Sequence, residues 1–228
     1  MRLDEESVLG RLRALQPTAV GVATEVFEDG GWPALVGRAT SWSHEALELS
    51  ALAAAALESA AAYLLRSRPA VRRLSLHAPL ELPDDGEREL AAVVGTIAPR
   101  LAAVVVHPHI LEEPARLAPL GELLALENMD ARKPGGHDVD ELEPYFAELP
   151  EARFCLDVAH VKTVDPSMEL GHVLVDAFGG RLCEVHISGI DDECGHLAFT
   201  LADVELYEPV LRRCRHVPWI LEALPADV

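Results

Sequence analysis

The stretch RFCLDVAHV (153–161) shows the pattern that decides the fold. It is a short apolar run whose end carries two polar side chains, Asp157 and His160. Runs of this kind are typical of strands that are buried on both faces in a parallel sheet. A helix-like segment follows over 167–178, so this part of the chain is predicted to be a strand followed by a helix.

The same pattern recurs along the whole chain. The other runs are AVGVATEV (19–26), EALELSA (45–51), VRRLSLHAP (71–79), LAAVVVHPH (101–109), ELLALENMD (122–130), RLCEVHIS (181–188) and PWILEAL (218–224). The segments rich in Ala, Leu and Glu between them are 51–67, 86–100, 138–149, 167–178 and 201–215. Alternation of strand and helix predicts βαβ units. The GGWP sequence in segment 28–44 predicts a loop before any helix there.

The spacing of the runs predicts the architecture. From Glu25 to Glu222, the polar residues at the run ends are on average about 28 residues apart, which is the length of one βα unit. Eight such units close a (β/α)8 TIM barrel. No linker rich in Pro, Gly or Ser divides residues 1–228, so we expect a single domain. A doubly wound sheet is the alternative, but it usually has a glycine-rich first turn, which is absent here.

The two ends of the chain are predicted to meet. Only six residues follow Glu222, so the eighth helix should be short or missing and should leave Trp219 and Leu221 uncovered. Segment 3–15 can form a helix that covers them, with the acidic residues 4–6 in its first turn. A partner subunit in a homo-oligomer is the alternative cover. The apolar stripe of the predicted helix consists of Val8, Leu9, Leu12 and Leu15.

Composition excludes some classes of function. The 228 residues include 38 acidic and 19 basic ones, for a net charge of −19, and only two lysines, Lys133 and Lys162. This charge opposes the binding of nucleic acid, which needs a basic surface, and favours a small-molecule substrate. The most apolar stretch, 49–65, is broken by Glu58 and is shorter than the roughly 18 clean residues that a membrane span needs.

The chain start and the cysteines point to one compartment. The sequence MRLDEESVLG has no apolar signal-peptide core. The cysteines lack CxxC spacing, so we expect reduced thiols in a cytoplasmic protein. They are Cys155, Cys183, Cys194 and Cys214.

Six of the eight runs end in His, Glu or Asp. In a TIM barrel the carboxyl ends of the strands converge on one face, where active sites lie. Residues two positions earlier point the same way, so Val105, Ala125 and Cys155 should fill the barrel beneath these ends. The expected ring consists of His77, His107, Glu127, Asp157, His186 and Glu222, and His160 and His196 follow strand ends closely.

The ring has the composition of a metal site. Imidazole and carboxylate together suit zinc, manganese, iron or cobalt. Clustered carboxylates without nearby Lys or Arg repel one another, and a bound cation relieves the repulsion. Each residue alone could be a hydrogen-bonded loop residue or a helix cap. Their recurrence at the same height on six strands is what predicts a divalent metal site.

These residues also carry a family resemblance. The motifs are LHAP (76–79), VVHPH (105–109), ALEN (125–128), LDVAH (156–160), EVHISGID (184–191) and ILEAL (220–224). Together they resemble the strand-end motifs of the xylose isomerase-like TIM-barrel superfamily, over roughly residues 70–224. That superfamily contains sugar isomerases and epimerases and the endonuclease IV family of abasic-site nucleases.

Resemblance to the epimerases implies one divalent ion and a proton transfer. The ligands would be Glu127, Asp157, His186 and Glu222, and the two glutamates would move the proton on either face of a sugar carbon. His160 would contact a substrate hydroxyl. The arginine that these enzymes carry shortly after the strand-seven histidine is missing from this sequence.

Resemblance to the endonuclease IV family implies up to three zinc ions. The added ligands resemble His77, His107, His160 and His196. Cys194 stands where that family has an aspartate, and the arginine-rich DNA loops have no counterpart. The thiol is either a zinc ligand, on which a third metal site would depend, or a small residue in a tight loop.

Three functions therefore stay open. A divalent-metal-dependent sugar isomerase or epimerase is the first. A multinuclear zinc phosphoester hydrolase is the second, and a barrel that binds a metal or ligand without turnover is the third. The number of ions, from one to three, separates the first two.

Overall fold

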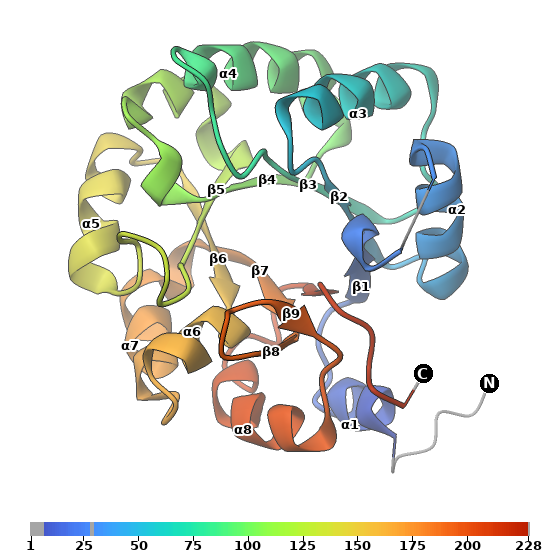
Figure 1. The fold of residues 1–228 in the computed structure, drawn as a ribbon, viewed down its shortest axis with the longest axis vertical. Coiled ribbons are helices and arrows are strands. Elements are labelled where there is room, and N and C mark those ends of the chain that lie inside the picture. The colour runs from blue at the N-terminus through green and yellow to red at the C-terminus, as the bar shows by residue number, and fades with distance from the viewer. Residues whose placement is uncertain (1–6, 28–29, 228) are drawn as a thin grey trace.

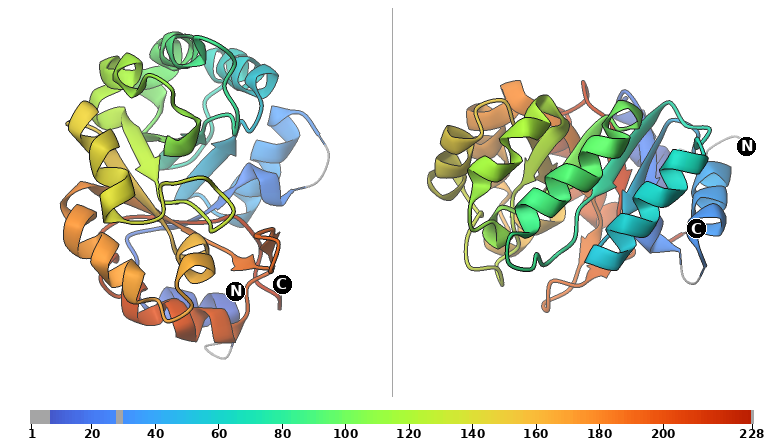
Figure 2. Two further views of the ribbon diagram at one scale, coloured as in Figure 1. Left: turned by 60° about the vertical axis from the view of Figure 1, so that its left-hand side comes forward. Right: turned by 90° about the horizontal axis from the view of Figure 1, so that it is seen from above.

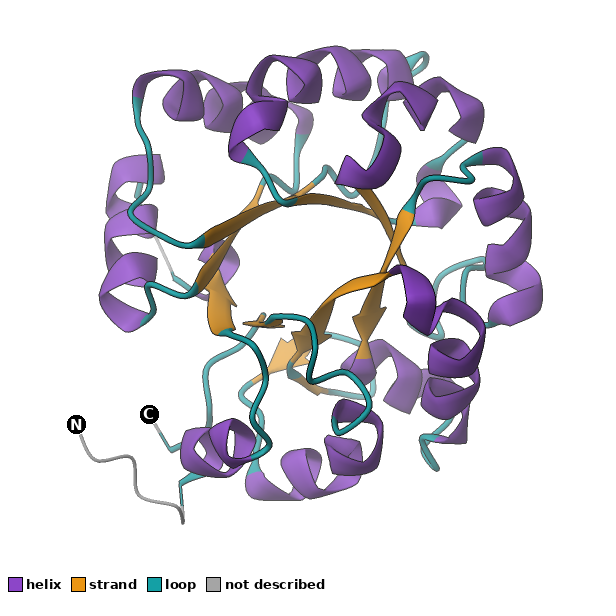
Figure 3. Cartoon of the chain, turned by 180° about the vertical axis from the view of Figure 1, so that it is seen from behind, coloured by secondary structure: helices purple, strands orange, loops and turns teal. Residues whose placement is uncertain are grey.

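The computed structural model describes residues 7–27 and 30–227. Eight parallel strands form a closed barrel in the order β1-β10-β7-β6-β5-β4-β3-β2, with helices around it (Figure 1). The strands are β1 (Val20–Ala23), β2 (Ala46–Ser50), β3 (Arg73–His77), β4 (Ala103–Val106), β5 (Leu124–Glu127), β6 (Arg153–Asp157), β7 (Leu182–Ile187) and β10 (Trp219–Leu221). The predicted (β/α)8 barrel is confirmed, and Figure 3 shows the ring of strands from behind.

The helices form the outer layer. They are α1 (Val8–Ala14), α2 (Trp32–Trp42), α3 (Ala54–Arg66), α4 (Gly86–Ile97), α5 (Val139–Glu148), α6 (Val158–Val164), α7 (Glu169–Phe178) and α8 (Leu201–Leu211). The inner faces of the helices are apolar. In α3, for example, Leu57 and Leu64 are buried against the barrel. Among the described residues, no helix has the length and hydropathy of a membrane-spanning helix.

Three segments depart from a simple alternation of strand and helix. The run 153–161 is a strand only as far as Asp157, because the Asp157 side chain accepts a hydrogen bond from the His160 amide (2.6 Å) and so starts α6. In segment 28–44 the helix α2 begins directly after Gly31, with Pro33 in its first turn, where proline has a favourable φ. Between β4 and β5 the chain forms a 3-10 segment, Pro114–Leu123, in place of an α-helix.

The predicted N-terminal helix forms and packs beside α8. The Ser7 hydroxyl accepts a hydrogen bond from the Gly10 amide (3.0 Å) and starts α1, and Leu12 is fully buried. Arg11 pairs with Glu208 of α8 at 2.9 Å, and the left view of Figure 2 shows the two helices side by side. Residues 222–227 form no helix. The acidic residues 4–6, expected in the first turn, lie outside the described residues.

The barrel interior is built mainly from small side chains. It includes the buried residues Ala103, Val105, Ala125, Cys155 and Cys183. At Gly21 the strands β1 and β2 approach so closely that a Cβ would lie 2.5 Å from the Ala46 carbonyl oxygen. Small side chains leave space inside the barrel, and the structure places polar groups there as well as at the strand ends.

Candidate metal centre

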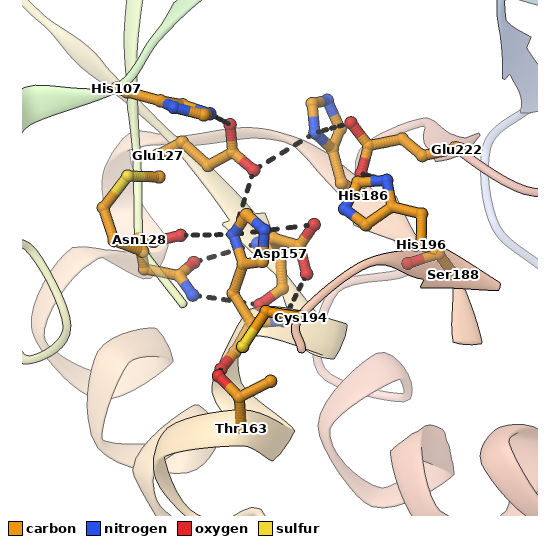
Figure 4. Close-up of polar contacts among 12 residues, drawn as sticks. His107, Glu127, Asn128, Asp157, Thr163, His186, Ser188, Cys194, His196 and Glu222 are labelled. Atoms are coloured by element: carbon orange, nitrogen blue, oxygen red, sulfur yellow. Dashed lines mark hydrogen bonds and ion pairs between the residues drawn. The ribbon is translucent and has the colours of Figure 1, made fainter. Parts of the chain in front are cut away.

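The six predicted strand-end residues lie together at one mouth of the barrel, and Figure 4 labels all of them except His77. Three of them are the last residues of β3, β5 and β6, one is next to last in β7, and two follow β4 and β10 directly. None is more than 6% exposed. They are His77, Glu127, Asp157, His186, His107 and Glu222.

Glu127 lies at the centre of this group. Its Oε2 atom is 3.3 Å from Nε2 of His77 and 3.3 Å from Nε2 of His107. Its Oε1 atom is 3.4 Å from Nδ1 of His186 and 3.5 Å from Nδ1 of His160. One carboxylate thus faces four imidazole rings, which come from β3, β7, α6 and the segment after β4.

Glu222 faces Glu127 across His186. The Glu222 Oε1 atom lies 3.0 Å from Nδ1 of His186, and its Oε2 atom lies 3.9 Å from Nδ1 of His196. His196 belongs to the short hairpin of β8 (Gly189–Ile190) and β9 (His196–Leu197), which follows β7. Its Nδ1 atom is also 3.4 Å from Oε1 of Glu25, so the hairpin brings a further imidazole to the barrel mouth.

Asp157 and His160 are held by the neighbouring residue Asn128. The Asn128 side chain accepts from the Asp157 amide (2.9 Å) and donates to the Asp157 carbonyl (2.9 Å). Nδ1 of His160 lies 2.9 Å from the Asn128 carbonyl oxygen. When Nδ1–H donates there, Nε2 of His160 keeps a lone pair for a ligand.

Several buried atoms of the ring make no hydrogen bond to the described residues. They include Oε1 of Glu127, Oδ2 of Asp157, Oε2 of Glu222 and both ring nitrogens of His186. Leaving buried carboxylate oxygens unsatisfied is costly in free energy. One ligand atom from each of these four residues lies within 4.8 Å of the others. Three carboxylates and an imidazole suit a divalent cation such as zinc or manganese, so this group fits a metal.

Four further groups of ligand atoms share a residue with the first, and two of these consist only of predicted site residues. His77 and His107 join Glu127, and His160 and His196 join Asp157. All eight predicted site residues therefore lie in groups that could hold a metal ion. Cys194 belongs to none of the groups found among the described residues.

Cys194 lies in a tight turn beside the ring. Its φ is +58°, its amide donates to the Asp191 carbonyl (3.0 Å), and its thiol is hydrogen-bonded to Asp130. Asp157, and not the thiol, completes the group with His160 and His196. This geometry favours the interpretation of Cys194 as a small residue in a tight loop.

The two facing glutamates of the ring, Glu222 and Glu127, differ in pKa. Burial raises the pKa of Glu222 to about 7. Burial also raises the pKa of Glu127, but His186, His107 and His77 outweigh it and hold that pKa well below its usual range.

The histidines differ in the same way. Burial lowers the pKa of His107 to about 4. Burial alone would lower the pKa of His77 too, but the carboxylates of Glu127, Glu48 and Glu222 raise it to about 10. The ring therefore contains imidazoles of very different basicity a few ångströms apart.

Two buried glutamates beneath the ring were not predicted. Oε2 of Glu48 lies 3.3 Å from Nε2 of His186, and Oε1 of Glu184 lies 3.8 Å from the same atom. Glu48 lies in the run 45–51 but was not placed in the site. The register explains its position, because Glu48 pairs with Ser75, two residues before His77, and so lies one layer lower. The signal for Glu184 is its place two residues before His186 in the same strand.

A cavity of about 240 Å³ opens above the ring. Its walls include most of the ring and also the side chains of Arg132 and Lys133, which were not predicted to belong to the site. The site is therefore a concave space with ligand-type groups at its base and two basic residues in its wall.

Comparison with known proteins identifies the fold. No protein-family model and no curated protein matches the sequence. Among solved structures, 3-keto-D-glucoside 4-epimerase YcjR from E. coli matches with 12% identity over 92% of this chain and 93% of that one, with a TM-score of 0.56. D-psicose 3-epimerase matches with 10% identity over 90% and 84% of the two chains and a TM-score of 0.60.

A third structure, that of the probable 3-DHS dehydratase AsbF from Bacillus anthracis, matches with 12% identity over 89% and 92% of the chains, with a TM-score of 0.54. The chain thus has the barrel fold found in sugar epimerases. The expected resemblance to xylose isomerase-like barrels is confirmed at the level of the fold.

Proposed function

We propose that the protein is a divalent-metal-dependent enzyme that isomerises or epimerises a small sugar or a related polyhydroxy compound. The observation that carries this proposal is the pair of glutamates, Glu127 and Glu222, which face each other across His186. Glu127, Asp157, His186 and Glu222 would hold the ion. A divalent ion bound there would polarise a carbonyl and its neighbouring hydroxyl, and so acidify the adjacent C–H bond.

The chain supplies the groups for moving a proton. Isomerisation and epimerisation need one base to remove a proton from carbon and an acid to return it. Two carboxylates on opposite sides of a cavity can divide these tasks between the two faces of the substrate. His160, whose Nδ1 is bonded to the Asn128 carbonyl, would present Nε2 to a substrate hydroxyl. The 3-keto-D-glucoside 4-epimerase and the D-psicose 3-epimerase with this fold lend support to the sugar class.

The test is hydrogen exchange at substrate carbon. Protein purified without chelator and loaded with zinc or manganese would be incubated in D₂O with a panel of ketoses and aldoses. We expect deuterium at a carbon next to the carbonyl of at least one sugar, and no exchange with Glu222→Gln. Glu148→Gln, which removes one charge from an exposed position on α5, is the matched control and should exchange like wild type.

Hydrolysis of a small phosphoester is the second candidate. It is favoured by the two extra ligand groups, in which His77 and His107 share Glu127, and His160 and His196 share Asp157. Adjacent ions that share carboxylates can activate a water and stabilise the charge on a phosphoester in the transition state.

Metal content and one variant separate the two candidates. One tightly bound ion per chain favours the isomerase, and two or three favour the hydrolase. His107→Asn should leave proton exchange on a sugar largely intact if the first proposal is right. If metal-loaded wild type exchanges no sugar proton but cleaves bis(p-nitrophenyl) phosphate, and His107→Asn abolishes that cleavage, the second function replaces the first.

A further inference from the structure

The two lysines of this acidic chain have different surroundings. Lys162 forms an ion pair with Asp203 at 2.9 Å. The ammonium of Lys133 makes no hydrogen bond or ion pair within residues 7–27 and 30–227, and its half-buried side chain lines the cavity above the ring. Burial raises the pKa of the nearby Asp130, but the Arg132 amide, His160 and, with a smaller effect, this ammonium lower it, and no carboxylate forms an ion pair with the ammonium among the described residues.

Arg132 lines the cavity next to Lys133. Its Nη2 donates to the Cys194 carbonyl (3.1 Å), and its Nε lies 3.5 Å from Oδ1 of Asp130. The guanidinium therefore joins the loop after β5 to the loop before β9. Its side chain is still 55% exposed, and no contact occupies Nη1 within the described residues.

The backbone of the loop after β5 fixes where both basic side chains start. The Arg132 amide donates to Oδ1 of the buried Asp130 (2.9 Å), and the Lys133 amide donates to the Asp130 carbonyl (3.0 Å). The loop is closed by the Met129 amide, which donates to the Gly136 carbonyl (2.8 Å). Gly136 has a φ of +89°, and a Cβ there would lie 2.9 Å from the Met129 side chain. The left view of Figure 2 shows this yellow-green loop at the end of the barrel.

The cavity is lined by both negatively and positively charged side chains. The base carries the carboxylates of Glu127 and Glu222, which repel an anion and attract a cation, and the lining also includes the carboxylates of Glu25 and Asp130. Arg132 and Lys133 are the two permanently cationic side chains among the residues that line the cavity. Hydroxyl groups need no such charge, whereas phosphate and carboxylate oxygens form their strongest hydrogen bonds with guanidinium and ammonium groups.

We propose that Arg132 and Lys133 bind an anionic group, a phosphate or a carboxylate, at one end of a polyhydroxy substrate whose other end faces the ring. The substrate class is then a sugar phosphate or a sugar acid, and not a neutral sugar. The proposal rests on the proposed function in placing the substrate in this cavity.

Matched probes test the preference for charge. Binding to zinc-loaded protein would be measured by calorimetry for D-fructose against D-fructose 6-phosphate, and for D-glucose against D-glucuronate. We expect at least one anionic probe to bind about tenfold or more tightly than its neutral partner, the scale of one charge-assisted hydrogen bond. Which pair shows the preference tells phosphate from carboxylate. The preference should shrink in 0.5 M salt, because part of this site is open to solvent.

Variants assign the preference to the loop. Lys133→Met, which breaks no hydrogen bond or ion pair of the ammonium, should reduce the preference severalfold, and Lys133→Met combined with Arg132→Gln should abolish it. Arg68→Gln removes one charge from an exposed residue between α3 and β3, outside the cavity lining, and should keep the full preference. A loop that merely lost its order would weaken the binding of neutral and anionic probes alike.

Failure of the anion-binding proposal can be distinguished from failure of the proposed function. Glu222→Gln, measured at zinc concentrations high enough to keep it loaded, should lose proton exchange and keep the anion preference. A wild type that lacks isomerase activity but keeps the preference would overturn only the proposed reaction. Equal affinity for the members of both pairs in wild type, no binding of either anionic probe, or a preference that survives in the double variant would overturn the proposal for Arg132 and Lys133.

Discussion

The two mouths of the barrel are built from the same strands but differ in how their charged groups are satisfied. β3 begins at Arg73 and ends at His77, and β6 begins at Arg153 and ends at Asp157. At the first mouth, Arg73 donates to the Cys183 carbonyl (3.0 Å), and Arg153 donates to the carbonyls of Glu122 and Ala102. At the second mouth, several carboxylate and imidazole atoms are buried without hydrogen-bond partners among the described residues.

This difference distinguishes the mouth that stabilises the barrel from the mouth that can bind a ligand. Guanidinium groups bonded to backbone carbonyls cross-link the first mouth, although Nε of Arg73 is buried without a hydrogen-bond partner among the described residues. A buried group of unsatisfied carboxylates lowers stability unless something else binds it. In TIM barrels the carboxyl-terminal mouth holds the active site, and the opposite mouth serves stability. Changes at the carboxyl-terminal mouth should therefore reduce metal binding, whereas changes at the opposite mouth should lower the free energy of unfolding.

The largest effect is expected from the two facing glutamates. Glu127→Gln and Glu222→Gln should each weaken metal binding by more than about 100-fold, beyond the 10–100-fold typical of an outer-shell partner, and abolish activity. Metal per chain after gel filtration is the measurement. Arg153→Met, at the other mouth, should lower the free energy of unfolding by about 1–3 kcal/mol and leave the metal content unchanged. Unaltered metal content and activity in Glu222→Gln would contradict the assignment of the ring.

The next effect concerns the framework alone. Leu12 of α1 is fully buried, so Leu12→Ala should lower the free energy of unfolding by about 2–5 kcal/mol. Deleting residues 1–16 should cost several kcal/mol, since each buried Leu or Val contributes roughly 1.5–3 kcal/mol. The control is Leu65→Ala on α3, where the side chain is 55% exposed and the change should be within about 0.5 kcal/mol. A deletion that melts at the wild-type temperature in the same oligomeric state would show that α1 does not close the barrel.

A smaller effect is expected one layer beneath the ring. With a proton on Nε2, His186 can donate to Glu48 and keep Nδ1 for an ion, since the two atoms Nε2 and Oε2 are 3.3 Å apart. Glu48→Gln should therefore weaken metal binding by about 10–100-fold without changing the number of ions bound. Titration with a metal-sensitive dye would measure this. Wild-type affinity in Glu48→Gln would mean that the orientation of His186 is set by its own strand.

Metal loading should also release protons. Burial alone lowers the pKa of His186, but Cys155, Glu222, Glu48 and Glu127 raise it well above its usual range, so the metal-free protein holds a proton there near neutral pH. An ion must displace that proton, so metal affinity should rise with pH, by about tenfold per unit for each proton released. Calorimetry in buffers of different ionisation enthalpy counts the protons. A binding enthalpy that is the same in all buffers would contradict this charge state.

Much of the fold could be predicted from the sequence because the apolar runs recur at the length of a βα unit. The ring could be predicted for the same reason, since strands of similar length place their last polar residues at one height. Glu48 and Glu184 were missed because their depth depends on strand register, which periodicity does not specify. Arg132 and Lys133 were missed because they lie in a loop whose course is set by backbone hydrogen bonds to Asp130 and by the left-handed Gly136.

The smallest effect is expected at Cys194, where the sequence left two interpretations open. If the thiol were a zinc ligand, Cys194→Ala would empty a third metal position. In the structure Asp157 completes that group, and the Cys194 thiol is bonded to Asp130, so the variant should bind as many ions as wild type with nearly the same affinity. Parallel zinc titrations of the two proteins decide this. Loss of one ion in Cys194→Ala would show that the thiol turns toward His160 and His196 when metal is present. Three tightly bound ions in both proteins would show that a third metal position exists and does not depend on the thiol. That result would favour phosphoester hydrolysis as the function of the site.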